Sequence, residues 1–542
     1  MLSILFYWFI ILLFTLGIGQ KISRFIGIKA NEPIFDFLNG LYYYLMISWI
    51  ASYFTGVYSS ILLILIILSG IFSVVNILST PVNPSLKLFI DKKILLFFVT
   101  LVLIVAFNSS LVPFLPDNES YYVQTIKWAG QYGLVPGLIN LHPFLGQFSG
   151  WHILQAAMFG YENRFFNDLN GLLFILFVFF VLKKLLSFLN RPENKTDALI
   201  GLQIIIIPFL FLFVNSPSPD LPVFIIAQLI FYLFVKNYNR ISDASVKQMI
   251  LLFFFALMIK LTALPLVVFP LLLIIKKASK SLSIFFAIFL FFTLILCISK
   301  NLIISGYLFY PFSCCSGIIH FLWKYPPELM EFMNNLGRNE SQTLQFNRLV
   351  LSDFLSWLLK DKIHTVLHIF WVFLLFVFPW ASSKFKINKS LIIIYITALF
   401  YFLTLLFIQP NFRFFFYFIP FLFIGVSYSL FSKFRFQYLL FFSLLLIIPL
   451  NVYMIKTGNQ IDWDTIFIRN RVSGYDKNFK QGKIENLLYY YPENKALFWE
   501  TGNAPLPAVN KNQLEYFMKY KNYYPQKIKK DLKSGFYSKK IE

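Results

Sequence analysis

Long apolar runs recur along almost the whole chain, and they limit its possible folds more than any other feature. Most are roughly 17 to 25 residues long, and a helix of that length crosses about 30 Å of hydrocarbon. Inside such a layer each backbone amide needs an internal partner, which a helix supplies. Because 58% of the residues are hydrophobic and only 13% are charged, against about a quarter in soluble domains, we predict an all-α polytopic membrane protein.

We expect about 14 membrane segments, two of which are short halves of one broken pair. The expected spans cover residues 2–19, 37–55, 58–78, 94–111, 169–189, 199–214, 221–235, the broken pair within 248–275, 281–299, 366–380, 390–408, 412–431 and 436–453. The transmembrane domain therefore occupies residues 1–453, and residues 454–542 form a C-terminal segment.

Positive charge gathers in seven of the loops between these spans. In a soluble protein a formal net charge of +22 suggests a nucleic-acid partner. Short loops rich in Lys and Arg, however, stay on the cytoplasmic side of a membrane. We therefore read the charge as a signal for orientation and expect no nucleic acid. The basic loops are 21–29, 87–93, 183–195, 236–247, 276–280, 384–389 and 433–435.

This alternation of basic and uncharged loops holds only if residues 248–275 enter and leave on the same side. Two half-helices meeting near Lys260 satisfy that condition, and Pro265 and Pro270 favour a break because proline removes a helix hydrogen bond. One long tilted helix is the alternative, and it would reverse every later loop. With the broken pair, both termini lie outside the cytoplasm.

The unusual polar stretches then all face the exterior. They are a first large loop at 108–167, the turn at 216–220, the Lys260 break, a second large loop at 300–365, the turn at 409–413 and the C-terminal segment. A transporter would carry polar groups through the midplane and show related halves, and no convincing internal repeat is present. The C-terminal segment is either a small domain over the outer face or, in its last twenty residues, a cationic arm near anionic lipid.

Asp117 and Glu119 stand two residues apart, directly after the run 94–111. Carboxylates at that depth are costly unless water, a cation or a substrate meets them. A helix cap with a solvated charge is the alternative. Residues 120–128 follow with apolar side chains at helical spacing, and we expect an amphipathic helix along the membrane surface with aromatic rings at headgroup depth.

An acid pair in the first outer loop, between a membrane span and an interfacial helix, resembles the GT-C superfamily of membrane glycosyltransferases, such as protein O-mannosyltransferases and aminoarabinose transferases. Five further motifs are similar to uncharacterised bacterial members. These are GLVPGLINLH at 133–142, SGWH at 149–152, SPSPD at 216–220, KLT at 260–262 and SGYLFYP at 305–311. The resemblance covers roughly residues 107–311 with 411–413, and the chain lacks the large outer domain of the best-studied members.

The resemblance implies a GT-C-type fold and transfer of a sugar, usually with inversion, from a polyprenyl-phosphate carrier. A carboxylate then deprotonates the acceptor hydroxyl while cations stabilise the departing phosphate. Asp117 carries over as the general base, with Glu119 orienting a group or binding a metal. Asp220 is a further acid that could complete a divalent Mg or Mn site with Asp117 or Glu119. A helix cap after two prolines is the alternative for Asp220.

Lys260 and Arg413 are the candidates for phosphate binding. A cation inside a span costs about 2.5 to 3.5 kcal/mol on insertion scales, so it tends to have an anionic partner. Snorkelling to the interface is the alternative for both. Lys300 lies just beyond its span and could also reach a phosphate, although snorkelling is favoured there.

Two histidines and a tryptophan of the first outer loop, His142, His152 and Trp151, complete the set of candidates for substrate or phosphate binding. Zinc binding by His142 and His152 lacks a third ligand in register, which favours ordinary packing or hydrogen bonding. Trp151 is a candidate for stacking on sugar or prenyl, although an aromatic belt also places tryptophan at this depth.

These observations predict a glycosyltransferase of a bacterial inner membrane that works on the periplasmic face, with a polyprenyl-phosphate sugar donor, a lipid, glycan or protein acceptor, and contacts to membrane lipids. Two alternatives remain. A polymerase or ligase would transfer a preassembled lipid-linked glycan, and a flippase or other transporter would show charged residues along a path through both leaflets.

Overall fold

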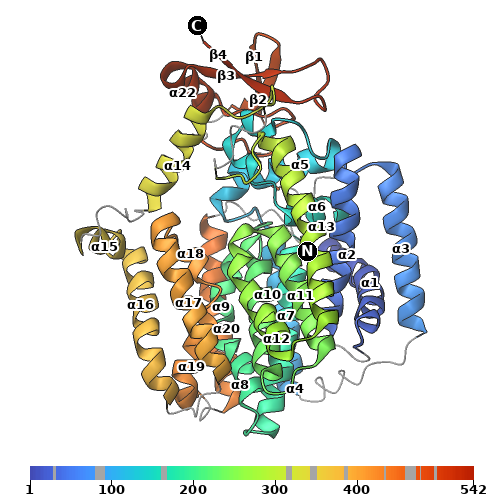
Figure 1. Cartoon of the computed structure of the whole chain (residues 1–542), viewed down its shortest axis with the longest axis vertical. Helices are drawn as coiled ribbons and strands as arrows, with labels where there is room; N and C mark the ends of the chain where they lie inside the picture. Colours follow the sequence, from blue (N-terminus) through green and yellow to red (C-terminus); the bar gives the residue numbers. More distant parts are fainter. Residues whose placement is uncertain are drawn as a thin grey trace.

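The computed structural model describes residues 1–28, 32–79, 92–159, 168–312, 320–341, 351–383, 389–431, 435–457, 472–475, 478–493 and 497–541. Most described residues are helical, and the helices form a bundle with a small unit of strands and one helix over one end (Figure 1). The two large loops, the basic loops at 87–93, 384–389 and 433–435, and residues 454–542 lie partly or wholly outside the described residues.

Nine helices of the described residues are long and apolar enough to cross a membrane, or ten with one bent pair. The helices to which these nine spans belong are α1 (Leu2–Phe25), α3 (Ser60–Leu78), α4 (Lys92–Ser110), α7 (Asp168–Asn190), α10 (Asp220–Asn237), α13 (Lys280–Ser305), α16 (Lys362–Ser383), α17 (Lys389–Ile408) and α20 (Phe436–Thr457). This confirms a mostly helical, polytopic architecture, while the count of about 14 segments stays a prediction.

Helix α2 (Pro33–Phe54) packs antiparallel to α1 at very short range. A Cβ atom added at Gly19 of α1 would lie 1.7 Å from the carbonyl oxygen of Asp36. Only a residue without a side chain fits at this crossing, so this glycine allows the two backbones to touch.

The broken pair is confirmed. Helix α11 (Asp243–Ile259) ends at Lys260, whose backbone is extended, and the chain returns through the 3₁₀ turn η7 (Leu261–Val267) and α12 (Val268–Lys277). The start of α11 and the end of α12 meet, because Lys277 Nζ lies 2.5 Å from Asp243 Oδ1. Residues 243–277 therefore enter and leave on one side of the bundle.

The expected span at 199–214 is not one straight helix. It consists of α8 (Lys195–Gly201), η5 (Leu202–Ile205), α9 (Ile207–Leu210) and η6 (Phe211–Phe213), with a bend of 59° in the middle. Pro208 stands at the start of α9, where its ring excludes a continuous helix. Helices α14 (Pro327–Ser341), α15 (Leu351–Leu358), α18 (Phe412–Phe415) and α19 (Ile419–Phe431) complete the helical part.

The structure describes residues 108–159 of the first large loop. They contain the π-helical turn η2 (Asn118–Tyr122), α5 (Val123–Gln131), the turns η3 (Leu138–Asn140) and η4 (Pro143–Gly146), and α6 (Gly150–Phe159). The expected helix is present, but its polar side is not exposed, because every residue from Val123 to Gly130 is buried. Its place along the membrane surface stays a prediction. The polar side of α5 meets protein instead of water.

The C-terminal segment is the part of the chain that the polar side of α5 contacts. Its strands β1 (Phe479–Ile484) and β2 (Leu487–Pro492) form one antiparallel hairpin, β3 (Tyr523–Lys527) and β4 (Phe536–Lys540) form another, and α22 (Lys511–Lys521) lies between them in the chain. Gln124 and Lys127 of α5 both donate to the carbonyl of Ala504, at 3.0 and 2.6 Å. The segment is thus folded onto the loop, and the alternative of a cationic arm fails for residues 523–540.

The bundle has two distinct ends. One end, which we call the cluster end, carries the first loop and the C-terminal segment and lies at the top of Figure 1. The lysine end holds basic loops that contact one another, since Lys183 and Lys184 both pair with Glu32 and Lys277 pairs with Asp243.

Candidate functional site

Asp117 and Arg413 form an ion pair at the cluster end. Asp117 directly precedes the π-helical turn, and Arg413 lies on α18, which Asn411 caps by accepting from the Arg413 amide at 3.3 Å. Arg413 Nη1 lies 2.7 Å from Asp117 Oδ2. An arginine guanidinium is not deprotonated in proteins, so Arg413 keeps its charge beside Asp117.

Asp220 and Lys260 form a second ion pair beside the first. Asp220 is the first residue of α10, and Lys260 directly follows the last residue of α11. The start of α10 and the end of α11 therefore lie next to each other, and the two side chains form an ion pair. The ring of Phe414 lies 4.8 Å from Lys260 Nζ and 5.6 Å from the Arg413 guanidinium. Two acids and two bases from four distant segments therefore converge, and we call Asp117, Asp220, Lys260 and Arg413 the charge cluster.

The two pairs differ in exposure. The side chains of Asp220 and Lys260 are 7% and 18% exposed, whereas those of Asp117 and Arg413 are 28% and 37% exposed. Access to the cluster is therefore through Asp117 and Arg413, while Asp220 and Lys260 form its deeper part.

Tyr122 contacts Asp117, and it was not singled out as a site residue from the sequence. Its hydroxyl donates to Asp117 Oδ2 at 3.2 Å. Its ring packs 4.9 Å from that of His152, whose Nε2 lies 3.1 Å from the carbonyl oxygen of Pro217. Burial lowers the pKa of His152 to about 3, so the imidazole is neutral and Nε2 donates to that carbonyl. The available signal was the five-residue spacing of Asp117 and Tyr122, which a π-helical turn brings to one side.

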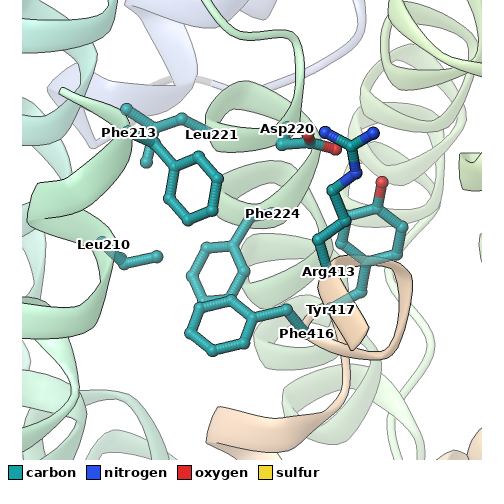
Figure 2. A pocket seen from close by; sticks show the side chains of 8 residues that line it. All are labelled: Leu210, Phe213, Asp220, Leu221, Phe224, Arg413, Phe416 and Tyr417. Carbon is teal, nitrogen blue, oxygen red and sulfur yellow. The ribbon is translucent and has the colours of Figure 1, made fainter. Parts of the chain in front are cut away.

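An apolar pocket adjoins the cluster. Its cavity volume is about 10 Å³, space for about one water molecule, within a recess of about 230 Å³ that includes open solvent. Figure 2 shows the Asp220 carboxylate, the Arg413 guanidinium and the Tyr417 ring together on one side of it. The rest of the lining is apolar and consists of Leu210, Phe213, Leu221, Phe224 and Phe416. The pocket thus combines charged groups with a lining that suits hydrocarbon.

A family model matches residues 1–420 of the chain. The chain belongs to the family described as "Domain of unknown function (DUF8201)". No curated protein and no solved structure shows significant similarity to it. The matched part of this DUF8201 chain contains all four residues of the charge cluster and ends before the C-terminal segment.

Glu119 lies outside the charge cluster of this DUF8201 protein. Its carboxylate accepts hydrogen bonds from the Ser473 hydroxyl and, at 2.9 Å, from the Gly474 amide. These partners belong to the C-terminal segment, far away in the sequence. The structure therefore does not bring Glu119 together with Asp117 at a common ligand.

His142 also contacts the C-terminal segment. Its Nδ1 accepts from the Phe144 amide at 3.2 Å, and its Nε2 lies 3.0 Å from the carbonyl oxygen of Trp499. Burial lowers the pKa of His142 to about 4. The neutral imidazole accepts at one nitrogen and donates at the other, which is the packing and hydrogen-bonding role expected as the alternative to zinc.

Trp151 and Lys300 lie at the margin of the site. The indole of Trp151 is fully buried and donates to Asn170 Oδ1 at 2.6 Å, so stacking on a sugar is wrong because the ring has no open face. Asn170 in turn donates to the carbonyl of Ser218, and Trp151 thus supports the turn before Asp220. Lys300 Nζ donates to the carbonyl of Gln147 at 3.1 Å.

The divalent metal site stays a prediction. Among the described residues no three His, Cys, Asp or Glu side chains gather as metal ligands. Asp117 and Asp220 already face Arg413 and Lys260, and Mg or Mn would have to displace these cations. With Lys260 and Arg413 in place, the cluster fits a phosphate better than a metal ion. We therefore derive no catalytic step through a metal ion.

Proposed function

We propose that the protein is a GT-C-type membrane glycosyltransferase that transfers a sugar, with inversion, from a polyprenyl-phosphate donor to a hydroxyl of a lipid, glycan or protein acceptor. In this proposal the cluster end faces the periplasm of a bacterial inner membrane. The observation that carries it is the convergence of two acids and two bases at helix breaks beside an apolar pocket.

The pocket and the cations suit the two halves of such a donor. A polyprenyl phosphate is an anion on a hydrocarbon chain, and the pocket offers phenylalanine rings next to Arg413. A donor phosphate bound there would exchange places with the carboxylates that now pair with Lys260 and Arg413. The two cations then stabilise the negative charge that develops on the departing phosphate.

The same exchange prepares the acid for its role. Arg413 and Tyr122 both contact Oδ2 of Asp117, so once Arg413 turns to the phosphate, Oδ2 keeps the hydrogen bond from Tyr122 and the acceptor hydroxyl meets Oδ1. That oxygen takes the proton of the acceptor hydroxyl as the new glycosidic bond forms and the bond between sugar and phosphate breaks. Polyprenyl phosphate leaves, and the proton on Asp117 returns to solvent through the more exposed side of the cluster.

A deletion strain tests this function. We expect it to accumulate a lipid-linked sugar that mass spectrometry of the lipid extract identifies, and the full-length gene to remove it. Asp117→Asn should insert and fold normally yet fail to remove the lipid. Asp243→Asn is the matched control, because this acid also pairs with a lysine but at the lysine end. Removal of the lipid by Asp117→Asn, or no accumulation at all, would contradict the proposal.

A further inference from the structure

Glu119 holds the C-terminal segment with both its backbone and its side chain. Its carbonyl oxygen accepts from the amides of Thr501 and Gly502, each at 2.9 Å. Its carboxylate accepts from the Ser473 hydroxyl and the Gly474 amide. One residue of the first loop thus contacts two separate stretches of the C-terminal segment.

The neighbouring positions are built for this contact. Asn118 is fully buried and donates to the carbonyl of Val472 at 3.0 Å. Gly502 has a φ of +54°, and a Cβ atom there would lie 3.2 Å from Glu119 Oε2 and 2.6 Å from Cβ of Tyr475. A larger residue at 502 would be strained and would crowd the carboxylate. The segment therefore approaches Glu119 as closely as its backbone permits.

The same turn carries the proposed general base. Asp117 precedes Asn118 and Glu119, and Tyr122 at the other end of the turn returns to Asp117 with its hydroxyl. The turn is therefore held from two sides, by Arg413 through Asp117 and by the C-terminal segment through Glu119. π-Helical turns are rare in proteins overall, and those that occur are frequently found at functional sites.

We propose that Glu119 is a positioning residue through which the C-terminal segment fixes the Asp117 carboxylate against Arg413 and Tyr122. This inference rests on the proposed function for its consequence in catalysis. It assigns to Glu119 neither a metal nor a proton. The carboxylate accepts from Ser473 at Oε2, and from Gly474 and Asn118 at Oε1. In a glutamine the amide oxygen can keep the bonds at Oε1, while the NH2 group donates to the Ser473 hydroxyl, which then accepts.

Two substitutions separate positioning from direct participation. Glu119→Ala removes the side-chain bonds to Ser473, Gly474 and Asn118, and we expect kcat to fall by about tenfold or more, since small misplacements of a catalytic group can cost up to about 10²-fold. The apparent KM for the polyprenyl-phosphate donor should stay within about twofold, because Lys260 and Arg413 lie on other elements. Glu119→Gln keeps an acceptor oxygen and should retain roughly a third or more of the wild-type kcat.

Hydrogen exchange of the full-length protein in detergent supplies a readout that needs no substrate. Glu119→Ala should speed exchange at the Gly474 amide and in the peptide around residues 115–131, whereas Glu119→Gln should change both much less. Glu485→Ala is the matched control, because this carboxylate bonds Tyr524 and Lys539 within the C-terminal segment. It should leave exchange in residues 115–131 unchanged.

The outcomes are decisive for the positioning role. It is overturned if Glu119→Gln is as inactive as Glu119→Ala, which would indicate a charged or metal-binding role, or if Glu119→Ala alters neither kcat nor exchange. Full activity of Asp117→Asn would instead remove the proposed function, while the exchange data would still report whether the segment orders the turn.

Discussion

The cluster end and the lysine end both bury charged side chains, but they use them differently. At the lysine end, Lys183 and Lys184 lie 2.6 and 3.0 Å from Glu32. The nearby Asp197 of α8 accepts from Ser187 of α7 at 2.5 Å. Each acid there meets donors from the segments that it joins, as expected for groups that connect helices.

At the cluster end the charges stand at interruptions of the backbone. Lys260 lies at a helix break, Asp220 follows two prolines and Arg413 lies on a four-residue helix. An apolar pocket adjoins them, and their carboxylates pair with cations from other segments. Glu32 and Asp243 of the lysine end also stand at helix ends, so the adjoining apolar pocket is what distinguishes the candidate site from a structural ion pair.

The largest expected effect comes from Arg413. Arg413→Ala should lower transfer by about 10² to 10³-fold, because it removes a donor aimed at developing charge. Lys184→Ala, at the lysine end, should change kcat by less than about twofold. Initial rates with vesicles that contain the purified variants and the polyprenyl-linked sugar from the deletion strain provide the measurement. Equal losses in both variants would break the contrast between the two ends.

Lys260 should affect donor binding more than acceptor binding. Lys260→Ala removes the buried cation beside Asp220 and leaves that carboxylate unpaired, and we expect the apparent KM for the donor to rise by about tenfold. Lys277→Ala is the matched variant at the other end of the same re-entrant pair. It should leave the donor KM as it is. An unchanged donor KM in Lys260→Ala would remove this lysine from the site.

The sequence predicts the membrane-length helices and the residues of the charge cluster well. Apolar runs have the length of a membrane span, and the alternation of basic loops required the turn back at Lys260, which the contact of Asp243 with Lys277 confirms. Asp117, Asp220, Lys260 and Arg413 could each be singled out because ionisable groups are rare in such surroundings. Their pairing follows from their common side of the bundle.

The partners of the first loop could not be predicted in the same way. Glu119 and His142 contact residues more than three hundred positions away, in a C-terminal segment whose fold has no strong local pattern. Amphipathicity indicated the polar side of residues 120–128. It does not say whether that side meets water or another part of the chain, and here Gln124 meets the C-terminal segment.

Acid pH should loosen the C-terminal segment from the first loop. The pKa of His142 is lowered from 6.5 to about 4 by burial. Because the unfolded group binds protons more readily, this part of the stability is present above pH 6.5 and is lost as the pH falls toward 4. A protonated Nδ1 would also face the Phe144 amide that it now accepts from.

Limited proteolysis of the full-length protein between pH 7 and pH 4 measures this. Cleavage within residues 497–541 should rise as the pH falls, by an amount equivalent to about 3 kcal/mol. His364→Asn is the control, because that histidine is exposed and lies at Asp361. His142→Asn should abolish most of the pH dependence. A segment equally resistant at both pH values would contradict the neutral, buried state of His142.

The smallest effect is expected at Glu32, and it concerns stability alone. Glu32→Ala removes the common partner of Lys183 and Lys184, whose side chains are 31% and 10% exposed. Lys183 can turn to solvent, while Lys184 keeps the rings of Phe180 and Tyr232 at 5.1 and 5.2 Å. The cost should therefore be only about 1 kcal/mol, a shift of a few degrees in the melting temperature in detergent, with transfer unchanged. Loss of transfer without loss of stability would mean that the lysine end acts on the charge cluster across the bundle, and the distinction between a structural and a functional end would then no longer hold.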